Sequence, residues 1–231
     1  MDYCISAGIP ETQLRLTGAL WADDLLRRSS SRAERRAKLI RDVHINRTYW
    51  QTMRAKDFPF THDADFDGMT HDNRKLLIFS WPPNQWPRKA SGFATYDTFN
   101  IALMDMLAGL MHVGYANVVI SLHPTLVGTD FAETIKSTGL YVTDADLIDI
   151  IDCADLFCAT VSSTLLWSLC LGIPSVNFDI YRYGYREFKQ AGLEEAVSLR
   201  QLRDQLTVLI QDRDAYDEVK SKMSSVSDYW T

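Results

Sequence analysis

Apolar runs alternate with helical patterns from residue 75 onward. Short, largely apolar segments stand at 75–80 (KLLIFS), 117–122 (NVVISL), 156–160 and 174–179. Between the first two, apolar residues recur three or four positions apart over 98–112. Short apolar runs separated by amphipathic helices are typical of βαβ units, which build a parallel sheet. The pattern therefore predicts an α/β fold: a Rossmann-like parallel sheet with helices on both faces.

Shorter elements complete this pattern. We expect short helices at 131–137 and 144–151, a short strand at 141–142, a helix from 162 to 171 that Gly172 ends, and two C-terminal helices from Ser198. The first 74 residues differ, with an extended piece at 14–18, a helix at 32–49 and an acidic, turn-rich loop at 62–73. We therefore divide the chain into an N-terminal extension, 1–74, and one domain over 75–231.

The expected strands place several loops at one rim. Ligands of an open parallel sheet bind beyond the carboxyl ends of its strands. The loops at 80–88, 123–125, 161–164 and 179–185 should share that rim. We expect the function to lie there.

Hydroxyl residues mark the start of one helix at this rim. Ser162, Ser163 and Thr164 stand between a buried strand and an apolar helix. A helix N-terminus offers free N–H groups and a positive dipole end, which favour a diphosphate, and small hydroxyl residues add donors. The alternative is that Ser163 only caps the helix.

A histidine follows the second strand at the same rim. His123 precedes Pro124, so its imidazole should point into the site and donate a hydrogen bond to a leaving phosphate or a sugar hydroxyl. The alternative is a packing histidine held by Pro124. His44 and His112 have weaker positions, and His112 sits on a helix beside apolar neighbours.

Charge and cysteine usage exclude several classes. A net charge of −6 and a pI near 5.3 argue against a nucleic-acid partner, which requires a basic face. The four cysteines form no C-x-x-C pair, and three lie in apolar surroundings, as buried reduced thiols do. Neither a signal-peptide pattern nor a membrane-length apolar stretch occurs. These features predict a cytoplasmic protein.

Two charged segments permit more than one interpretation. Residues 27–41 carry seven basic residues against one acid, which favours a solvated helix face. The alternative is peripheral contact with anionic lipid or with a lipid-phosphate acceptor at the inner face of the membrane. The series Asp63, Asp65, Asp67 imitates a calcium loop, but Arg74 stands where the bidentate Glu should be, which favours a solvated loop.

Motifs for other chemistry are missing from the sequence. Neither G-x-G-x-x-G nor G-x-x-x-x-G-K-[ST] occurs, so hydride transfer and P-loop chemistry lose their main support. No Cys and His cluster with metal-ligand spacing is present either. We therefore expect no cofactor and no metal.

The ordered motifs of the chain resemble the C-terminal domain of GT-B glycosyltransferases. They are Thr17-Gly18 with Asp23, the strand at 76–80, Leu122-His123-Pro124, Ala154-Asp155, Ser162-Ser163-Thr164 and Leu171-Gly172-Ile173-Pro174. The pattern is similar to surface-polysaccharide and CDP-glycerol glycerophosphotransferase enzymes and to non-hydrolysing UDP-N-acetylglucosamine 2-epimerases. The resemblance implies one GT-B C-terminal-type domain that binds a nucleotide-diphosphate sugar, with the interdomain connection within residues 1–74.

The resemblance also implies roles for individual residues. His123 would assist catalysis, and Ser162, Ser163 and Thr164 would contact the donor's phosphates. Trp167 stands where relatives often have a ribose-binding Glu, and Asp179, at the end of the next strand, is the substitute candidate. Arg88 or Lys89 would supply a positive charge from a loop.

Three functions follow as alternatives. The first is the donor-binding half of a glycosyltransferase or polyol-phosphate transferase of surface polysaccharide biosynthesis, which depends on a separate N-terminal acceptor domain or subunit. The second is a sugar-nucleotide 2-epimerase-like protein, although the loop at 81–86 lacks the epimerases' Gly-His-Arg-Arg-Glu-Asn sequence. The third is a non-catalytic binding or partner subunit. We expect the isolated chain to bind donor without transferring it.

Overall fold

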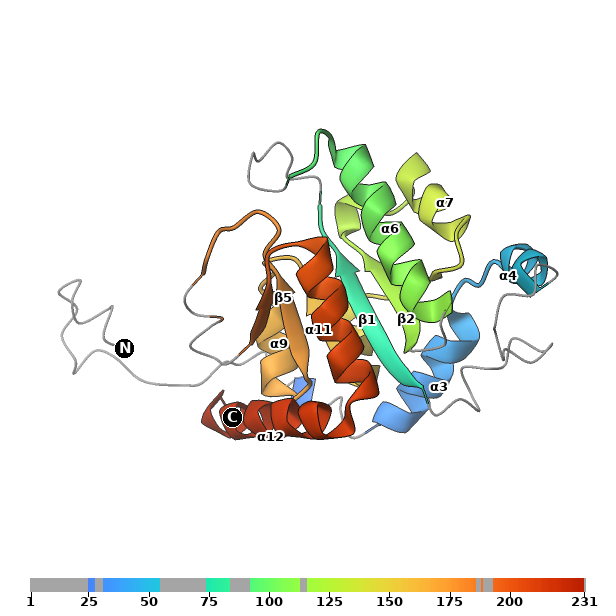
Figure 1. The fold of residues 1–231 in the computed structure, drawn as a ribbon. Coiled ribbons are helices and arrows are strands. Elements are labelled where there is room, and N and C mark those ends of the chain that lie inside the picture. Colours follow the sequence, from blue (N-terminus) through green and yellow to red (C-terminus); the bar gives the residue numbers. More distant parts are fainter. Residues whose placement is uncertain are drawn as a thin grey trace.

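A parallel sheet of six strands forms the centre of the molecule (Figure 1). The computed structural model describes residues 25–27, 31–54, 74–83, 92–112, 116–185, 188 and 193–230. Its strands are β1 (Lys75–Trp81), β2 (Ala116–Leu122), β3 (Tyr141–Thr143), β4 (Leu156–Ala159), β5 (Ser175–Phe178) and β6 (Glu194–Ala196). They lie in the order β3-β2-β1-β4-β5-β6, and each neighbouring pair is parallel. The predicted Rossmann-like α/β fold is confirmed.

Helices cover both faces of this sheet. The helices α6 (Tyr96–His112) and α11 (Leu199–Gln211) cover the front face in Figure 1, on either side of β1, and α9 (Thr164–Cys170) lies behind β5. Because helices cover both faces, side chains on both sides of the central strands are buried, and all seven residues of β2 are buried. After β3 the chain crosses to the other side of β1, so the strand order reverses between β1 and β4. That reversal is where ligands of such sheets bind.

Elements outside the sheet's βαβ units differ most from the predictions. The predicted helix at 32–49 is two helices, α3 (Arg32–Asp42) and α4 (Arg47–Arg54). Between them His44 leaves the helix and pairs with the edge strand β3. Its N–H donates to the Val142 carbonyl at 2.7 Å, and the Val142 N–H donates to the His44 carbonyl at 3.1 Å.

The helix predicted at 144–151 begins later. In the structure α8 spans Leu147–Ile150 and a 3₁₀ turn continues over Ile151–Cys153. The Thr143 hydroxyl accepts a hydrogen bond from the Ala145 N–H at 3.1 Å, which holds this segment in a turn rather than a helix. A short helix, α7 (Asp130–Lys136), confirms the prediction at 131–137, and Gly172 ends α9 with a φ of 62° as expected.

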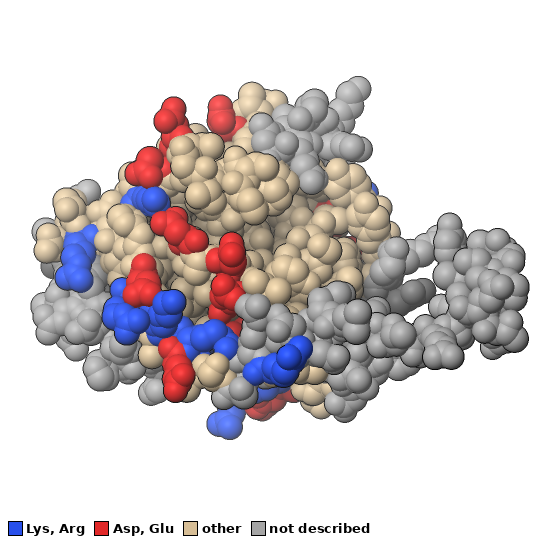
Figure 2. Space-filling view, turned by 180° about the vertical axis from the view of Figure 1, so that it is seen from behind, with Lys and Arg blue, Asp and Glu red and all other residues tan. Residues whose placement is uncertain are grey.

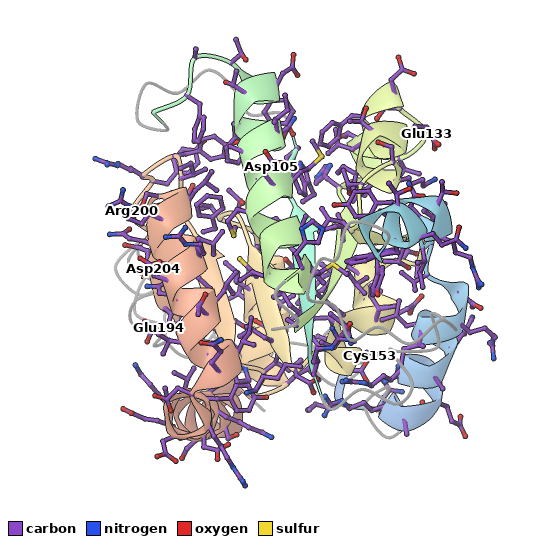
Figure 3. All side chains as sticks on the ribbon, turned by 45° about the vertical axis from the view of Figure 1, so that its right-hand side comes forward. Asp105, Glu133, Cys153, Glu194, Arg200 and Asp204 are labelled. Atoms are coloured by element: carbon purple, nitrogen blue, oxygen red, sulfur yellow. The ribbon has the colours of Figure 1, made fainter. Side chains whose placement is uncertain are left out.

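Three of the four cysteines are buried free thiols, as expected: Cys153, Cys158 and Cys170. Cys4 lies outside the described residues. Burial raises the pKa of the Cys153 thiol to about 12, and Cys153 lies beside α3 (Figure 3). Thiols with such raised pKa values are unreactive near neutral pH.

The basic helix α3 is fastened to the domain by ion pairs. Arg35 pairs with Asp152, while Arg32 and Arg36 pair with Asp155 at 3.1 and 2.9 Å. Blue and red side chains alternate over part of the face in Figure 2. The expectation of a solvated face is wrong for Arg35 and Arg36, whose side chains are only 20% and 27% exposed. Arg35 and Arg36 would therefore not be available to bind anionic lipid through residues 27–41.

The N-terminal helices also share the hydrophobic core of the domain. Leu39 and Val43 of the α3 end and Trp50 of α4 are buried in the same cluster as the strands. At the amino ends of the strands, α12 (Arg213–Trp230) crosses beneath α9 and α11 (Figure 1). Within the described ranges, no helix combines the length and the apolar character that crossing a membrane would require.

Replacing Asp155 by Ala should lower the free energy of unfolding by about 1–3 kcal/mol, because Arg32, Arg36 and the Leu76 N–H lose their acceptor. Urea denaturation measures this. The control is Asp217→Ala, which removes the exposed Arg213–Asp217 pair on α12 and should change stability by less than about 0.5 kcal/mol. Equal effects of the two changes would show that Asp155 does not fasten α3.

Candidate functional site

A cavity of about 620 Å³ opens at the carboxyl ends of four strands. Ser80 lines it from β1, His123 from the loop after β2, Thr143 from the end of β3, and Ser162 to Thr164 from the turn after β4. The cavity therefore spans the point where the strand order reverses. The predicted rim is confirmed for these loops, whereas the described residues of the 179–185 loop do not line this cavity.

The turn between β4 and α9 is strained. Val161 has a φ of 46°, which is unfavourable for a β-branched residue. Its N–H donates to the side-chain oxygen of Asn177 at 3.1 Å, and Asn177 is 1% exposed. Non-glycine residues in this region cost on the order of 1–3 kcal/mol and persist only where the surroundings impose them. Asn177, which the sequence did not single out, is one such restraint.

This turn leaves several donors unused at the start of α9. The Ser162 hydroxyl accepts from the Thr164 N–H at 3.3 Å and from the Thr164 hydroxyl at 2.9 Å. Ser163 is exposed, and its hydroxyl caps no N–H group of the helix. The alternative that Ser163 only caps the helix is thus wrong, since Ser162 does so. Within the described part of the chain the N–H groups of Ser162 and Ser163 have no acceptor.

His123 directs one ring nitrogen toward its own loop. Its Nδ1 accepts from the Thr125 N–H at 3.3 Å and lies 2.8 Å from the Thr125 hydroxyl. Because Nδ1 acts as an acceptor, the neutral ring carries its proton on Nε2. The half-buried imidazole therefore offers an Nε2–H donor at the cavity wall.

The other two histidines have structural surroundings. His112 lies 2.7 Å from the Tyr49 hydroxyl through Nε2 and stacks on that ring, and burial lowers its pKa. His44 makes the backbone bridge to β3. Neither lines the cavity.

The cavity wall also includes an indole ring and two carboxylates. Trp167 lines it from α9, and Asp144 and Asp146 line it from the loop after β3. Among the described residues of the wall, these aspartates are the only ionisable groups besides His123. Arg88 and Lys89, expected to supply positive charge, lie outside the described residues, as does the acidic loop at 62–68.

Asp179 occupies a different place from the ligand-facing one expected for it. It is 1% exposed, and its two carboxylate oxygens accept from the N–H groups of Tyr183 at 2.9 Å and Gly184 at 2.7 Å. Its side chain therefore fixes the loop after β5. A role in binding ribose stays a prediction, and the geometry gives Asp179 a positioning task.

The described residues contain no group of three or more His, Cys, Asp or Glu side chains placed to hold a metal ion. Among the described residues of the wall, the hydrogen-bond donors include N–H groups, hydroxyls and the His123 imidazole. Such a set can bind an anion by hydrogen bonds.

No protein-family model matches this chain, and no curated protein sequence matches it. Solved structures do. The UDP-GlcNAc 2-epimerase from Neisseria meningitidis, bound to UDP-GlcNAc, is similar with a TM-score of 0.59 and 18% identity; the match covers 100% of this chain and 55% of the epimerase. A variant of the wall teichoic acid polymerase TagF matches with a TM-score of 0.53 and 13% identity, over 99% of this chain and 50% of TagF.

The chain thus spans about half the length of these two solved structures. At these identities the likeness shows the fold. The resemblance to a GT-B C-terminal domain is confirmed at that level.

Exchanging Val161 for Gly should raise the free energy of unfolding by up to about 1 kcal/mol, because glycine adopts positive φ without strain. The matched control is Val127→Gly at another turn of the cavity, where φ is −65° and ψ is 132°. There glycine relieves nothing and should cost about 0.5–1 kcal/mol. Urea unfolding compares the two. A loss of stability of similar size at both positions would mean that the turn is not strained.

Proposed function

We propose that this chain binds a nucleoside diphosphate-activated sugar or polyol in the cavity between β1 and β4. It would act as the donor-binding half of a GT-B transferase of surface polysaccharide biosynthesis. The observation that carries the proposal is the cavity at the sheet's reversal point, with the free donors of Ser162 and Ser163 in its wall.

The diphosphate belongs at the Ser163 side of this cavity. Two backbone N–H groups, the Ser163 hydroxyl and the positive end of α9 favour an anion there. Asp144 and Asp146 stand in the loop after β3 and would repel it. The charges of the wall therefore orient the ligand.

The nucleoside then occupies the region between Trp167 and the loop after β3. An indole face provides a stacking surface for a base. The carboxylates of Asp144 and Asp146 can accept hydrogen bonds from ribose hydroxyls, which is the task that a Glu at position 167 would have. This assignment replaces the buried Asp179 with groups that reach the ligand.

His123 assists at the diphosphate. Its Nε2–H can donate to a phosphate oxygen, and this bond strengthens as the diphosphate leaves and gains charge. An acceptor site and a base, which a transferase also requires, would belong to another domain or subunit.

Nucleoside diphosphates should bind more tightly than the matching nucleosides, because the donors at Ser163 recognise phosphate. A thermal-shift panel of UDP, CDP, GDP and dTDP against their nucleosides tests this, since a ligand that binds the folded state raises stability by mass action. Equal shifts within every pair would overturn the proposed site.

Substitutions at the start of α9 test where the phosphates bind. Changing Ser163 and Thr164 together to Ala should weaken diphosphate binding by about 1–3 kcal/mol, while the nucleoside is unaffected. The control is Ser225→Ala, whose hydroxyl bonds a helix carbonyl on α12, away from the cavity. Unchanged calorimetric affinity in a folded double variant would place the phosphates elsewhere.

A 2-epimerase-like activity is the second candidate, favoured by the match of TM-score 0.59 to an epimerase over the whole chain. Epimerisation needs groups that remove and return a proton at the sugar carbon. Incubation with UDP-GlcNAc alone separates the two functions. We expect no epimerised sugar by nuclear magnetic resonance, and its accumulation would favour the epimerase.

A further inference from the structure

A second cavity, of about 290 Å³, adjoins the first at Ser163. Ser163 lines both cavities, so a group bound at Ser163 has one cavity on each side of that residue. The other described residues of the second wall are apolar or aromatic: Val161, Leu166, Tyr185 and Phe188. As far as the structure describes them, the two walls therefore differ in chemistry: the first is polar, and the second has only the Ser163 and Tyr185 side chains as polar groups.

Aromatic rings form a row that ends in this second cavity. The centroids of Tyr181 and Tyr183 lie 5.8 Å apart, those of Tyr183 and Tyr185 5.7 Å, and those of Tyr185 and Phe188 6.1 Å. These tilted and edge-on contacts hold each ring in place. Tyr185 is nonetheless 46% exposed, which leaves a large fixed ring surface facing solvent.

The backbone of this loop is fixed as well. Arg182 and Gly184 have φ values of 56° and 64°, and the buried Asp179 carboxylate accepts the N–H groups of Tyr183 and Gly184. A non-glycine residue at positive φ persists only where its surroundings impose it. The Tyr185 ring is therefore presented by a preorganised loop.

The direction of the ligand follows from these two walls. If the diphosphate lies at Ser163 and the nucleoside fills the first cavity, the group beyond the second phosphate must leave on the other side of Ser163. We propose that this group is a pyranose ring, and that its C–H face packs on Tyr185 and Phe188 in the second cavity. The assignment rests on the proposed function and adds the class of donor.

The apolar wall discriminates between two classes of donor. A pyranose has a face of C–H groups that gains from burial against aromatic rings. A glycerol group attached to the same diphosphate is small and hydroxylated along its length, so it gains little from Tyr185, Leu166 and Phe188. The sugar donor should therefore bind more tightly than the bare diphosphate, and the glycerol donor should not.

Calorimetry on the whole chain tests this with matched pairs: UDP with UDP-N-acetylglucosamine, GDP with GDP-mannose, dTDP with dTDP-glucose, and CDP with CDP-glycerol. In at least one sugar pair the sugar should add affinity. Tyr185→Ala should remove roughly threefold to tenfold of the affinity for that donor and leave the diphosphate unchanged. Tyr185→Phe should behave as wild type.

The control is Ile101→Ala, since Ile101 is 55% exposed on α6 and lines neither cavity. A Tyr185→Ala chain that keeps the sugar's added affinity would overturn the assignment, as would a wild-type chain in which only glycerol adds affinity. Phe188→Ala, checked for folding by thermal melting, gives a second variant with the same expectation. If no nucleoside diphosphate binds to wild type, the proposed function fails, and the assignment of the second cavity fails with it.

Discussion

The carboxylate of Asp155 connects the main parts of the fold. It accepts from the N–H group of Leu76 at 2.8 Å, where β1 begins, and from two arginines of α3. The carbonyl of the same residue accepts from the Tyr216 hydroxyl of α12 at 2.9 Å. Because Asp155 directly precedes β4, these bonds fix β1 against β4 at their amino ends. The cavity lies at the opposite, carboxyl ends of those two strands. The relative position of β1 and β4 therefore also sets the relative position of the loops that line the cavity.

At the carboxyl ends of the strands, two residues at the end of β5 and just after it have the corresponding role. Asn177 holds the strained turn at Val161, and Asp179 holds the aromatic loop. Both side chains are buried and accept backbone N–H groups from loops that carry the proposed ligand contacts. A site whose groups are fixed before binding loses less entropy when the ligand arrives. Asn177 and Asp179 can therefore support ligand binding without contacting the ligand themselves.

The sequence predicted what depends on local pattern. The strands β1 and β2 are rich in apolar residues, and Gly172 marks a helix end, so each was found near its observed bounds. The strand β6 was missed because Glu194-Glu195-Ala196 contains no apolar run. The pairing of α3 with Asp152 and Asp155 was missed because it joins residues more than a hundred positions apart. The Ser162–Thr164 turn was located, but its capping residue depends on backbone geometry that no spacing reveals.

The bridge between His44 and Val142 has a consequence for self-association. Edge strands expose unpaired backbone groups that can recruit another chain and start aggregation. At one edge of this sheet, His44 occupies both groups of Val142 in the short strand β3. At the other edge, β6 is only three residues long, and such a short edge strand offers few backbone groups to a second chain. Within the described residues, both borders of the sheet are thus poor templates for growth into intermolecular β-structure.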